Sequence, residues 1–182
     1  TVIGFSHMHL SGTGIGDLSY ISVMPVVGDV TLARGTEDEP GSGMWSYFSR
    51  ANEKCAPGYY ATRLDRYGVD VELTATPRVG FHKYTFPAGS DARVVIDLEN
   101  GTCWDAPIEG YITQVGATTL SGYRFSTGWA EDQKIYFTAE FSRPFSDFGV
   151  WESNTPRQGS ELKARQVYGI ARFDPDAGPV YM

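Results

Sequence analysis

A chain of 182 residues is long enough to form one domain with a sizeable core, and 41% hydrophobic and 20% charged residues are typical of a folded protein. The net charge of −7 argues against a nucleic acid or an anionic membrane surface as a partner, because both require a basic surface. No apolar run approaches the roughly 18 residues that cross a bilayer as a helix.

The beginning of the chain combines a strand-like run with a loop. The chain starts without a methionine, already inside the run Thr1–Phe5. We therefore expect residues 1–182 to be one domain that is either a piece of a longer protein or a mature product. The overlapping stretch 4–17, GFSHMHLSGTGIGD, places His7 and His9 two residues apart and continues with glycines at 12, 14 and 16 and with Asp17.

These two histidines are candidate metal ligands, because alternation places them on one face of a strand. A metal site needs further ligands, which Asp17 or the remaining histidine, His82, would have to supply. Otherwise the imidazoles are hydrogen-bonded, partly buried polar groups. The glycines lack the P-loop lysine, the Gly-x-Gly-x-x-Gly spacing and a following helix, which argues against a phosphate loop. The pattern indicates a tight loop whose main chain can approach another surface or a ligand closely.

Alternation of apolar and polar residues recurs along the rest of the chain, and helical periodicity is almost absent. The clearest case is 69–76 (VDVELTAT), which predicts a half-buried strand joined by a hairpin to Tyr59–Leu64. The other predicted strands are Tyr20–Val27, Val79–Phe86, Ala92–Leu98, Tyr111–Val115, Thr118–Phe125, Lys134–Phe141, Phe145–Trp151 and Lys163–Phe173. We expect loops at Arg34–Gly43 and Asn154–Gly159. Even spacing with turns between the strands predicts an all-β fold, an antiparallel β-sandwich.

The residues alone predict no catalytic set. The chain offers no recognisable serine–histidine–aspartate arrangement and no Cys-x-x-Cys motif. A lone carboxylate does not make a glycosidase site, because that chemistry needs a second carboxylate across the scissile bond. Cys55 and Cys103 leave a disulfide open, in an oxidising compartment only.

Four blocks, in register along the chain, resemble glycoside hydrolase family 92, the calcium-dependent exo-acting α-mannosidases. They are 4–17 (GFSHMHLSGTGIGD), 49–60 (SRANEKCAPGYY), 67–86 (YGVDVELTATPRVGFHKYTF) and 121–145 (SGYRFSTGWAEDQKIYFTAEFSRPF). The resemblance implies a supersandwich-like N-terminal β-sandwich that packs on a C-terminal (α/α)6 barrel, absent here, with the active site at the junction. It also implies that residues 1–182 are this N-terminal domain, incomplete at its N-terminus, because the family's first strands precede the signature at 4–17. It implies cleavage of mannose, with inversion, from the non-reducing end of an α-mannoside glycan, the α-1,2 linkage being our expectation.

In this family the general acid, the general base and the Ca2+ ligands lie on the helical domain. The resemblance therefore implies no catalytic residue and no metal ligand in this chain. We expect the loop from His7 to Asp17 to face the junction and to help form the mannoside pocket or the domain interface. The candidate substrate-binding residues are His7, His9, Ser11, Gly12, Thr13, Gly14 and Asp17.

Two alternatives stay open at this point. His7 and His9 could merely brace the sandwich, or the domain could be a non-catalytic carbohydrate-binding or interaction module. The resemblance also implies a bacterial enzyme of N-glycan degradation that is secreted, periplasmic or on the cell surface.

Overall fold

The computed structural model describes residues 1–8, 21–39, 41–100 and 105–182. Within those ranges the chain is nearly all β: fourteen strands form three antiparallel sheets, and the two helical segments, η1 (Arg50–Asn52) and η2 (Pro175–Ala177), are short 3-10 turns. The predicted antiparallel β-sandwich is therefore confirmed. No helix of the described residues is long and apolar enough to cross a membrane.

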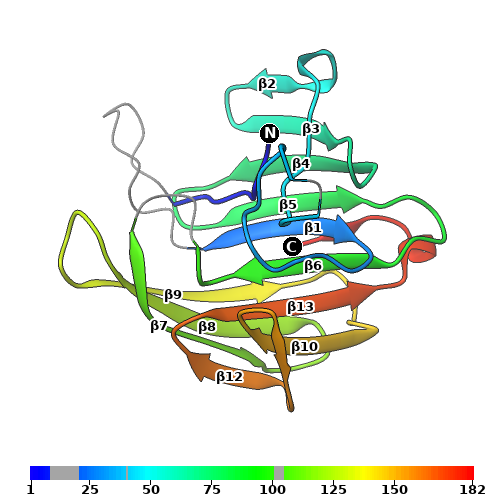
Figure 1. Cartoon of the computed structure of the whole chain (residues 1–182). Helices are drawn as coiled ribbons and strands as arrows, with labels where there is room; N and C mark the ends of the chain where they lie inside the picture. Colours follow the sequence, from blue (N-terminus) through cyan, green and yellow to red (C-terminus); the bar gives the residue numbers. More distant parts are fainter. Residues whose placement is uncertain (9–20, 40, 101–104) are drawn as a thin grey trace.

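The three sheets differ in their place in the molecule (Figure 1). The first sheet has the order β1 (Ser22–Val27), β6 (Ala92–Asp97), β13 (Val167–Phe173), β10 (Asp147–Glu152) and β11 (Thr155–Arg157). The second has the order β12 (Glu161–Ala164), β7 (Ala106–Gln114), β8 (Thr119–Thr127) and β9 (Gln133–Glu140). The third has the order β14 (Val180–Tyr181), β5 (Gly80–Thr85), β4 (Val69–Ala75), β3 (Tyr59–Leu64) and β2 (Lys54–Ala56). Strands β2 to β5 form the upper part of Figure 1, and the other two sheets form the lower part.

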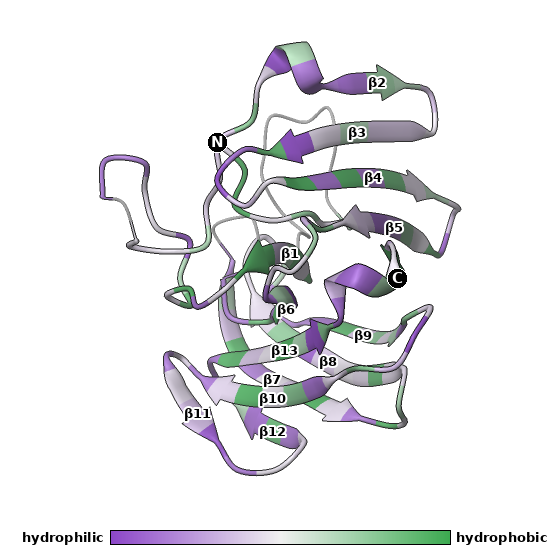
Figure 2. Ribbon diagram, turned by 90° about the vertical axis from the view of Figure 1, so that its right-hand side faces the viewer, coloured by the Kyte–Doolittle hydropathy of each residue, from purple (hydrophilic) through white to green (hydrophobic). Residues whose placement is uncertain are grey.

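One hydrophobic cluster connects all three sheets. It runs from Leu64 and Val71 in the third sheet through Val94 in the first to Ile112 and Leu120 in the second, all fully buried. Strand β6 is buried at every position, which requires protein on both faces of the first sheet. Figure 2 shows the corresponding apolar colouring of β1 at the centre of the molecule.

Two glycines allow the first and second sheets to approach each other closely. A Cβ on Gly169 of β13 would lie 2.6 Å from Cδ1 of Ile112 on β7, and one on Gly110 of β7 would lie 3.3 Å from Cβ of Val167. Gly169 therefore has room for a hydrogen atom and little more, because side-chain carbons do not approach within 3 Å, and Gly110 would accept a Cβ only if its neighbours shifted by a few tenths of an ångström.

The largest error of the sequence prediction is the single strand Lys163–Phe173. The chain instead forms β12 and β13, which belong to different sheets. Arg165 and Gln166 lie between the two strands and are both exposed, so the alternation of apolar and polar residues stops there. The strand before them, β12, is half-exposed, and the strand after them, β13, is almost entirely buried. At this corner the chain passes from one sheet to the other.

Two further predictions need correction, and several boundaries move. The predicted loop Asn154–Gly159 contains β11, which forms a hairpin with β10. The predicted strand Thr1–Phe5 makes only isolated bridges, Val2 to Ser46 and Phe5 to Val23, within the described residues. The short strands β2 and β14 were not predicted, and β7 begins at Ala106, five residues before the predicted start. Tyr20, the predicted start of β1, lies outside the described residues.

Candidate functional site

His7 is the one predicted site residue that the structure describes. It lies two residues after Phe5, whose main chain exchanges two hydrogen bonds of 2.9 Å with Val23 of β1. The His7 ring lies on β5, where Nε2 is 2.7 Å from Nε2 of His82. A Cβ on Gly80 of the same strand would stand 2.1 Å from Cδ2 of His7, so the ring occupies the space that this glycine leaves. Strand β5 therefore anchors the residue from which the predicted loop starts.

His82 links His7 to the core of the third sheet. Its side chain is buried, and its Nδ1 is 2.5 Å from the hydroxyl of Tyr84, which is also buried. Burial, and secondarily the neighbouring His7, lower the pKa of His82 from 6.5 to about 3, so its ring is neutral at physiological pH. Burial also raises the pKa of Tyr84 well above 10.0, so this hydroxyl keeps its proton.

The direction of the Tyr84–His82 hydrogen bond follows from counting donors. Among the residues that the structure describes, Nδ1 of His82 is the single hydrogen-bond partner of the Tyr84 hydroxyl. If Nδ1 carried the proton, the buried hydroxyl hydrogen of Tyr84 would have no acceptor, at a cost of about 1–3 kcal/mol. Tyr84 therefore donates, and Nδ1 of His82 accepts.

The two histidines meet as hydrogen-bonded groups and not as a pair of metal ligands. Two imidazole nitrogens on one tetrahedral zinc would be about 3.3 Å apart, given metal–nitrogen bonds of about 2.0–2.1 Å, whereas the observed separation is 2.7 Å. Over the described ranges, no group of three or more histidine, cysteine, aspartate or glutamate side chains converges on one point. These parts of the chain thus offer no ligand set for calcium or another metal.

The other predicted site residues lie outside the described residues, as does Cys103. They are His9, Ser11, Gly12, Thr13, Gly14 and Asp17. Their role in substrate binding stays a prediction. Cys55 is exposed on β2.

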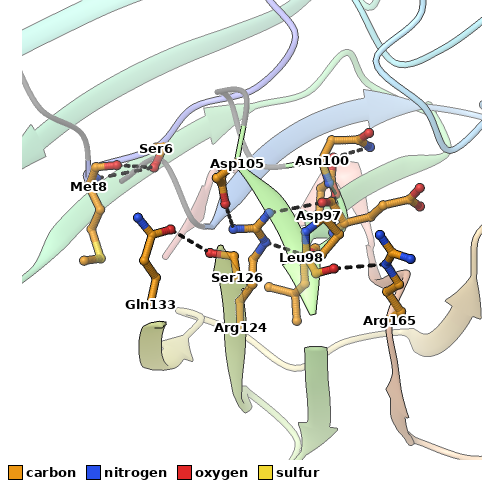
Figure 3. A network of polar contacts seen from close by, with 12 residues as sticks. Ser6, Met8, Asp97, Leu98, Asn100, Asp105, Arg124, Ser126, Gln133 and Arg165 are labelled. Atoms are coloured by element: carbon orange, nitrogen blue, oxygen red, sulfur yellow. Dashed lines mark hydrogen bonds and ion pairs between the residues drawn. The ribbon is translucent and has the colours of Figure 1, made fainter. Parts of the chain in front are cut away.

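A buried ionic network, which the sequence analysis missed, connects the end of β6 with the start of β7 (Figure 3). Arg124 of β8 is fully buried and donates from Nε to the main-chain oxygen of Leu98 (2.8 Å) and from Nη2 to that of Glu99 (3.2 Å). Its Nη1 forms an ion pair with Asp105, whose side chain is also fully buried.

Asp97 stabilises the turn that leaves β6. Its carboxylate accepts hydrogen bonds from the main-chain nitrogens of Glu99 (2.8 Å) and Asn100 (2.9 Å) and from the Asn100 side chain (3.1 Å). Burial outweighs these hydrogen bonds and raises the pKa of Asp97 to about 6. Asp97 and Asp105 are each bound to internal groups, so we assign both to the scaffold rather than to acid–base chemistry.

A polar cleft of about 470 Å³ lies beside this network. Its rim is fixed by internal hydrogen bonds: Arg165 donates to the main-chain oxygen of Pro107 (3.0 Å), and Gln166 donates to Glu99 (2.6 Å). The complete lining is Arg34, Glu99, Asn100, Asp105, Pro107, Arg165 and Gln166. Such a lining suits a polar ligand rather than an apolar one.

Comparison with known proteins gives one family. The sequence model of the glycosyl hydrolase family 92 N-terminal domain matches residues 1–182. A family 92 α-mannosidase from Bacteroides thetaiotaomicron, solved in complex with mannoimidazole, superposes with a TM-score of 0.91 at 32% identity, over 98% of this chain and 25% of its own.

Two more distant relatives agree with that match. A family 92 inverting mannosidase from the same bacterium has a TM-score of 0.79 at 24% identity, over 98% of this chain and 23% of its own, and supports the fold alone. A protein of Arthroderma benhamiae named an uncharacterized secreted glycosidase is 25% identical over 91% of this chain and 22% of its own. This chain thus spans about a quarter of the length of the proteins it matches.

Proposed function

Because the chain belongs to the N-terminal domain family of glycosyl hydrolase family 92, we propose that it is part of an exo-acting α-mannosidase. The proposed reaction removes mannose, with inversion, from the non-reducing end of a glycan, with an α-1,2 bond as the substrate. The name of one similar structure, an α-mannosidase in complex with mannoimidazole, supports this substrate class. The name of the secreted relative supports export from the cell.

The reaction itself requires groups from a second domain. Inversion needs an acid and a base about 6.5–9.5 Å apart, so that a water molecule fits opposite the leaving group. In the described residues, the buried carboxylates Asp97 and Asp105 are held by internal hydrogen bonds and an ion pair. As the resemblance to the family implies, the proposed acid, base and calcium ligands lie on a helical catalytic domain, where calcium would bind sugar hydroxyls and help to distort the ring.

The proposed role of this domain is to pack on the helical domain and to present the loop from His7 to Asp17 to the mannoside. The observation that carries this role is the anchoring of His7 on β5. Its Nε2 lies 2.7 Å from Nε2 of His82, and its ring packs against Gly80, which has no side chain. A glycine-rich loop that starts from a fixed point can bring main-chain groups and hydroxyls close to a sugar. Ser11, Thr13 and Asp17 would then bind hydroxyl groups of the substrate.

The test is hydrolysis of α-1,2-, α-1,3- and α-1,6-linked mannobioses by the intact protein, with proton NMR of the first mannose released. We expect the α-1,2 substrate to give the highest kcat/KM and β-mannose to appear first. Release of α-mannose first would contradict inversion, and hydrolysis of none of the three would contradict the proposed substrate class.

The carbohydrate-binding alternative predicts a different result. Residues 1–182 alone would bind mannobiose saturably at millimolar or lower concentration, whereas our proposal expects no such binding without the helical domain. Calorimetric titration of the isolated chain distinguishes the two.

A further inference from the structure

We propose that the outer face of the second sheet is a binding surface for a carbohydrate chain. This face carries two parallel rows of side chains that cross β7, β8 and β9, which lie side by side in the lower part of Figure 1. The proposal rests on the proposed function, since it takes an α-mannoside chain as the ligand.

The first row, here called the tyrosine row, consists of Tyr111, Tyr123 and Tyr136. They are direct cross-strand neighbours, Tyr111 opposite Tyr123 and Tyr123 opposite Tyr136. The ring centroids of successive tyrosines are 5.4 Å and 5.8 Å apart, so the rings form one continuous aromatic surface. With neighbouring strands about 4.8 Å apart, the row extends over about 10 Å, the length of a short oligosaccharide.

The second row, here called the hydroxyl row, consists of Thr113, Ser121 and Thr138. Thr113 is opposite Ser121, and Ser121 is opposite Thr138. Because side chains on one face of a strand recur every second residue, this row runs parallel to the tyrosine row. A hollow of about 360 Å³ lies along both rows, and all three tyrosines, Ser121 and Thr138 are in its lining. Aromatic rings and hydroxyl groups therefore border the same hollow.

This combination fits a sugar better than a protein partner. A pyranose has a face of C–H groups, which packs on aromatic rings, and a rim of hydroxyl groups, which exchange hydrogen bonds with side-chain hydroxyls. The outward positions of β8 and β9 carry aromatic, hydroxyl-bearing and charged side chains and no aliphatic one. The centres of protein–protein interfaces are depleted of serine, whereas Ser121 lies in the middle of the hydroxyl row.

The charges beside the tyrosine row favour a neutral ligand. Lys163 is opposite Tyr111, and its ammonium lies 3.1 Å from Glu109. Lys134, the next outward residue of β9 before Tyr136, lies 2.8 Å from Asp132. A phosphate or sulfate group would have to compete with these carboxylates for either lysine. An uncharged carbohydrate chain has no such competition.

The tyrosine row is largely ordered before a ligand binds. The Tyr123 hydroxyl donates to Glu109 over 2.9 Å, and the Tyr111 hydroxyl donates to Glu161 over 2.9 Å. Rings that are already held in place lower the entropic cost of binding. Tyr136 is turned 59° from Tyr123 and is 66% exposed, so it offers the most accessible ring surface of the row.

The test is native gel electrophoresis of the intact protein in gels with and without soluble α-mannan, because binding to the polymer slows the protein. Tyr136→Ala removes the most exposed ring and should raise the mannan dissociation constant roughly five- to tenfold. Thr138→Val removes one hydroxyl group, keeps the side-chain shape and should raise it about threefold. Phe81→Ala is the matched control, because Phe81 is also an exposed aromatic residue (46%) but lies on β5 of the third sheet.

Three results would overturn the proposal. In the first, mannan does not slow the unchanged protein. In the second, Tyr136→Ala and Phe81→Ala change the mannan dissociation constant by the same factor. In the third, Tyr136→Ala weakens binding and also lowers the unfolding temperature of the intact protein, because the helical domain would then cover this face.

Kinetics separate this proposal from the proposed function. A disaccharide covers only two of the three rings, so Tyr136→Ala should lower kcat/KM on mannan by a larger factor than on mannobiose. For the same reason residues 1–182 alone should not bind mannobiose saturably in the millimolar range. If mannobiose is hydrolysed but mannan does not slow the protein, only the binding surface is wrong. If mannan slows the protein through Tyr136 but no mannobiose is hydrolysed, the binding surface stands and the proposed reaction is wrong.

Discussion

Replacing His82 by glutamine should remove one acid-sensitive contribution to the stability of this fold. Burial and His7 hold the pKa of His82 at about 3 in the folded chain, against 6.5 when exposed. The unfolded chain therefore binds one more proton than the folded chain between these values, and stability rises with pH across this window. The contribution of His82 to the free energy of unfolding is fully present above pH 6.5 and is lost as pH falls towards 3. Between pH 7.5 and pH 4.5 only the two pH units below 6.5 count, so the loss is about 3 kcal/mol, at about 1.36 kcal/mol for each of these units.

The assay is urea unfolding of residues 1–182 and of His82→Gln at both pH values. Asp97 titrates in the opposite sense, because burial raises its pKa from 3.8 to about 6, so the folded chain takes up its proton first. Its contribution is common to both proteins and cancels in their difference. We expect the stability advantage of the unchanged chain to shrink by about 3 kcal/mol on acidification. An advantage that is the same at pH 7.5 and pH 4.5 would refute the reasoning.

Three further substitutions test the packing of the scaffold by urea unfolding. Arg124→Met leaves the fully buried Asp105 without its ion pair and should lower the free energy of unfolding by about 3–5 kcal/mol; a loss below about 1 kcal/mol would contradict the network. Gly122→Ala brings a Cβ within 2.1 Å of a main-chain oxygen on β7 and should cost about 3 kcal/mol, whereas a neutral effect would show that the sheet yields there. Arg143→Met should stabilise the chain by about 1 kcal/mol, because its guanidinium, beside Phe173, has no hydrogen-bond partner among the described residues; destabilisation would show that the charge is compensated.

Strands with one buried face were predictable from sequence, and the switch between sheets was not. In β4, Val69 and Val71 are fully buried while Asp70 between them is exposed, so the local pattern carries the structure directly. In 161–173 both segments satisfy strand patterns, and only the packing of β13 beside β6 determines that they belong to different sheets. That choice depends on partners far away in the sequence, which local alternation does not encode.

The candidate site shows the same limit. His7 was a predicted site residue because it begins the glycine-rich stretch. Its contact with His82 was not predictable, because it joins residues 75 positions apart and depends on the absence of a side chain at Gly80. Arg124 did leave a signal: it alternates with Leu120 and Gly122 on the inward side of β8, and an inward arginine requires a carboxylate partner. No sequence pattern identifies Asp105 as that partner, because the pairing arises from the fold.

The central claim is that the loop from His7 to Asp17 takes part in mannoside hydrolysis. The most direct measurement is kcat/KM of the intact protein and of His9→Ala on α-1,2-mannobiose, with thermal unfolding as the control for domain association. Our account predicts that His9→Ala lowers kcat/KM by about tenfold or more, the equivalent of one substrate hydrogen bond and its orientation, at an unchanged unfolding temperature. An unchanged kcat/KM, with domain association also unchanged, would contradict it.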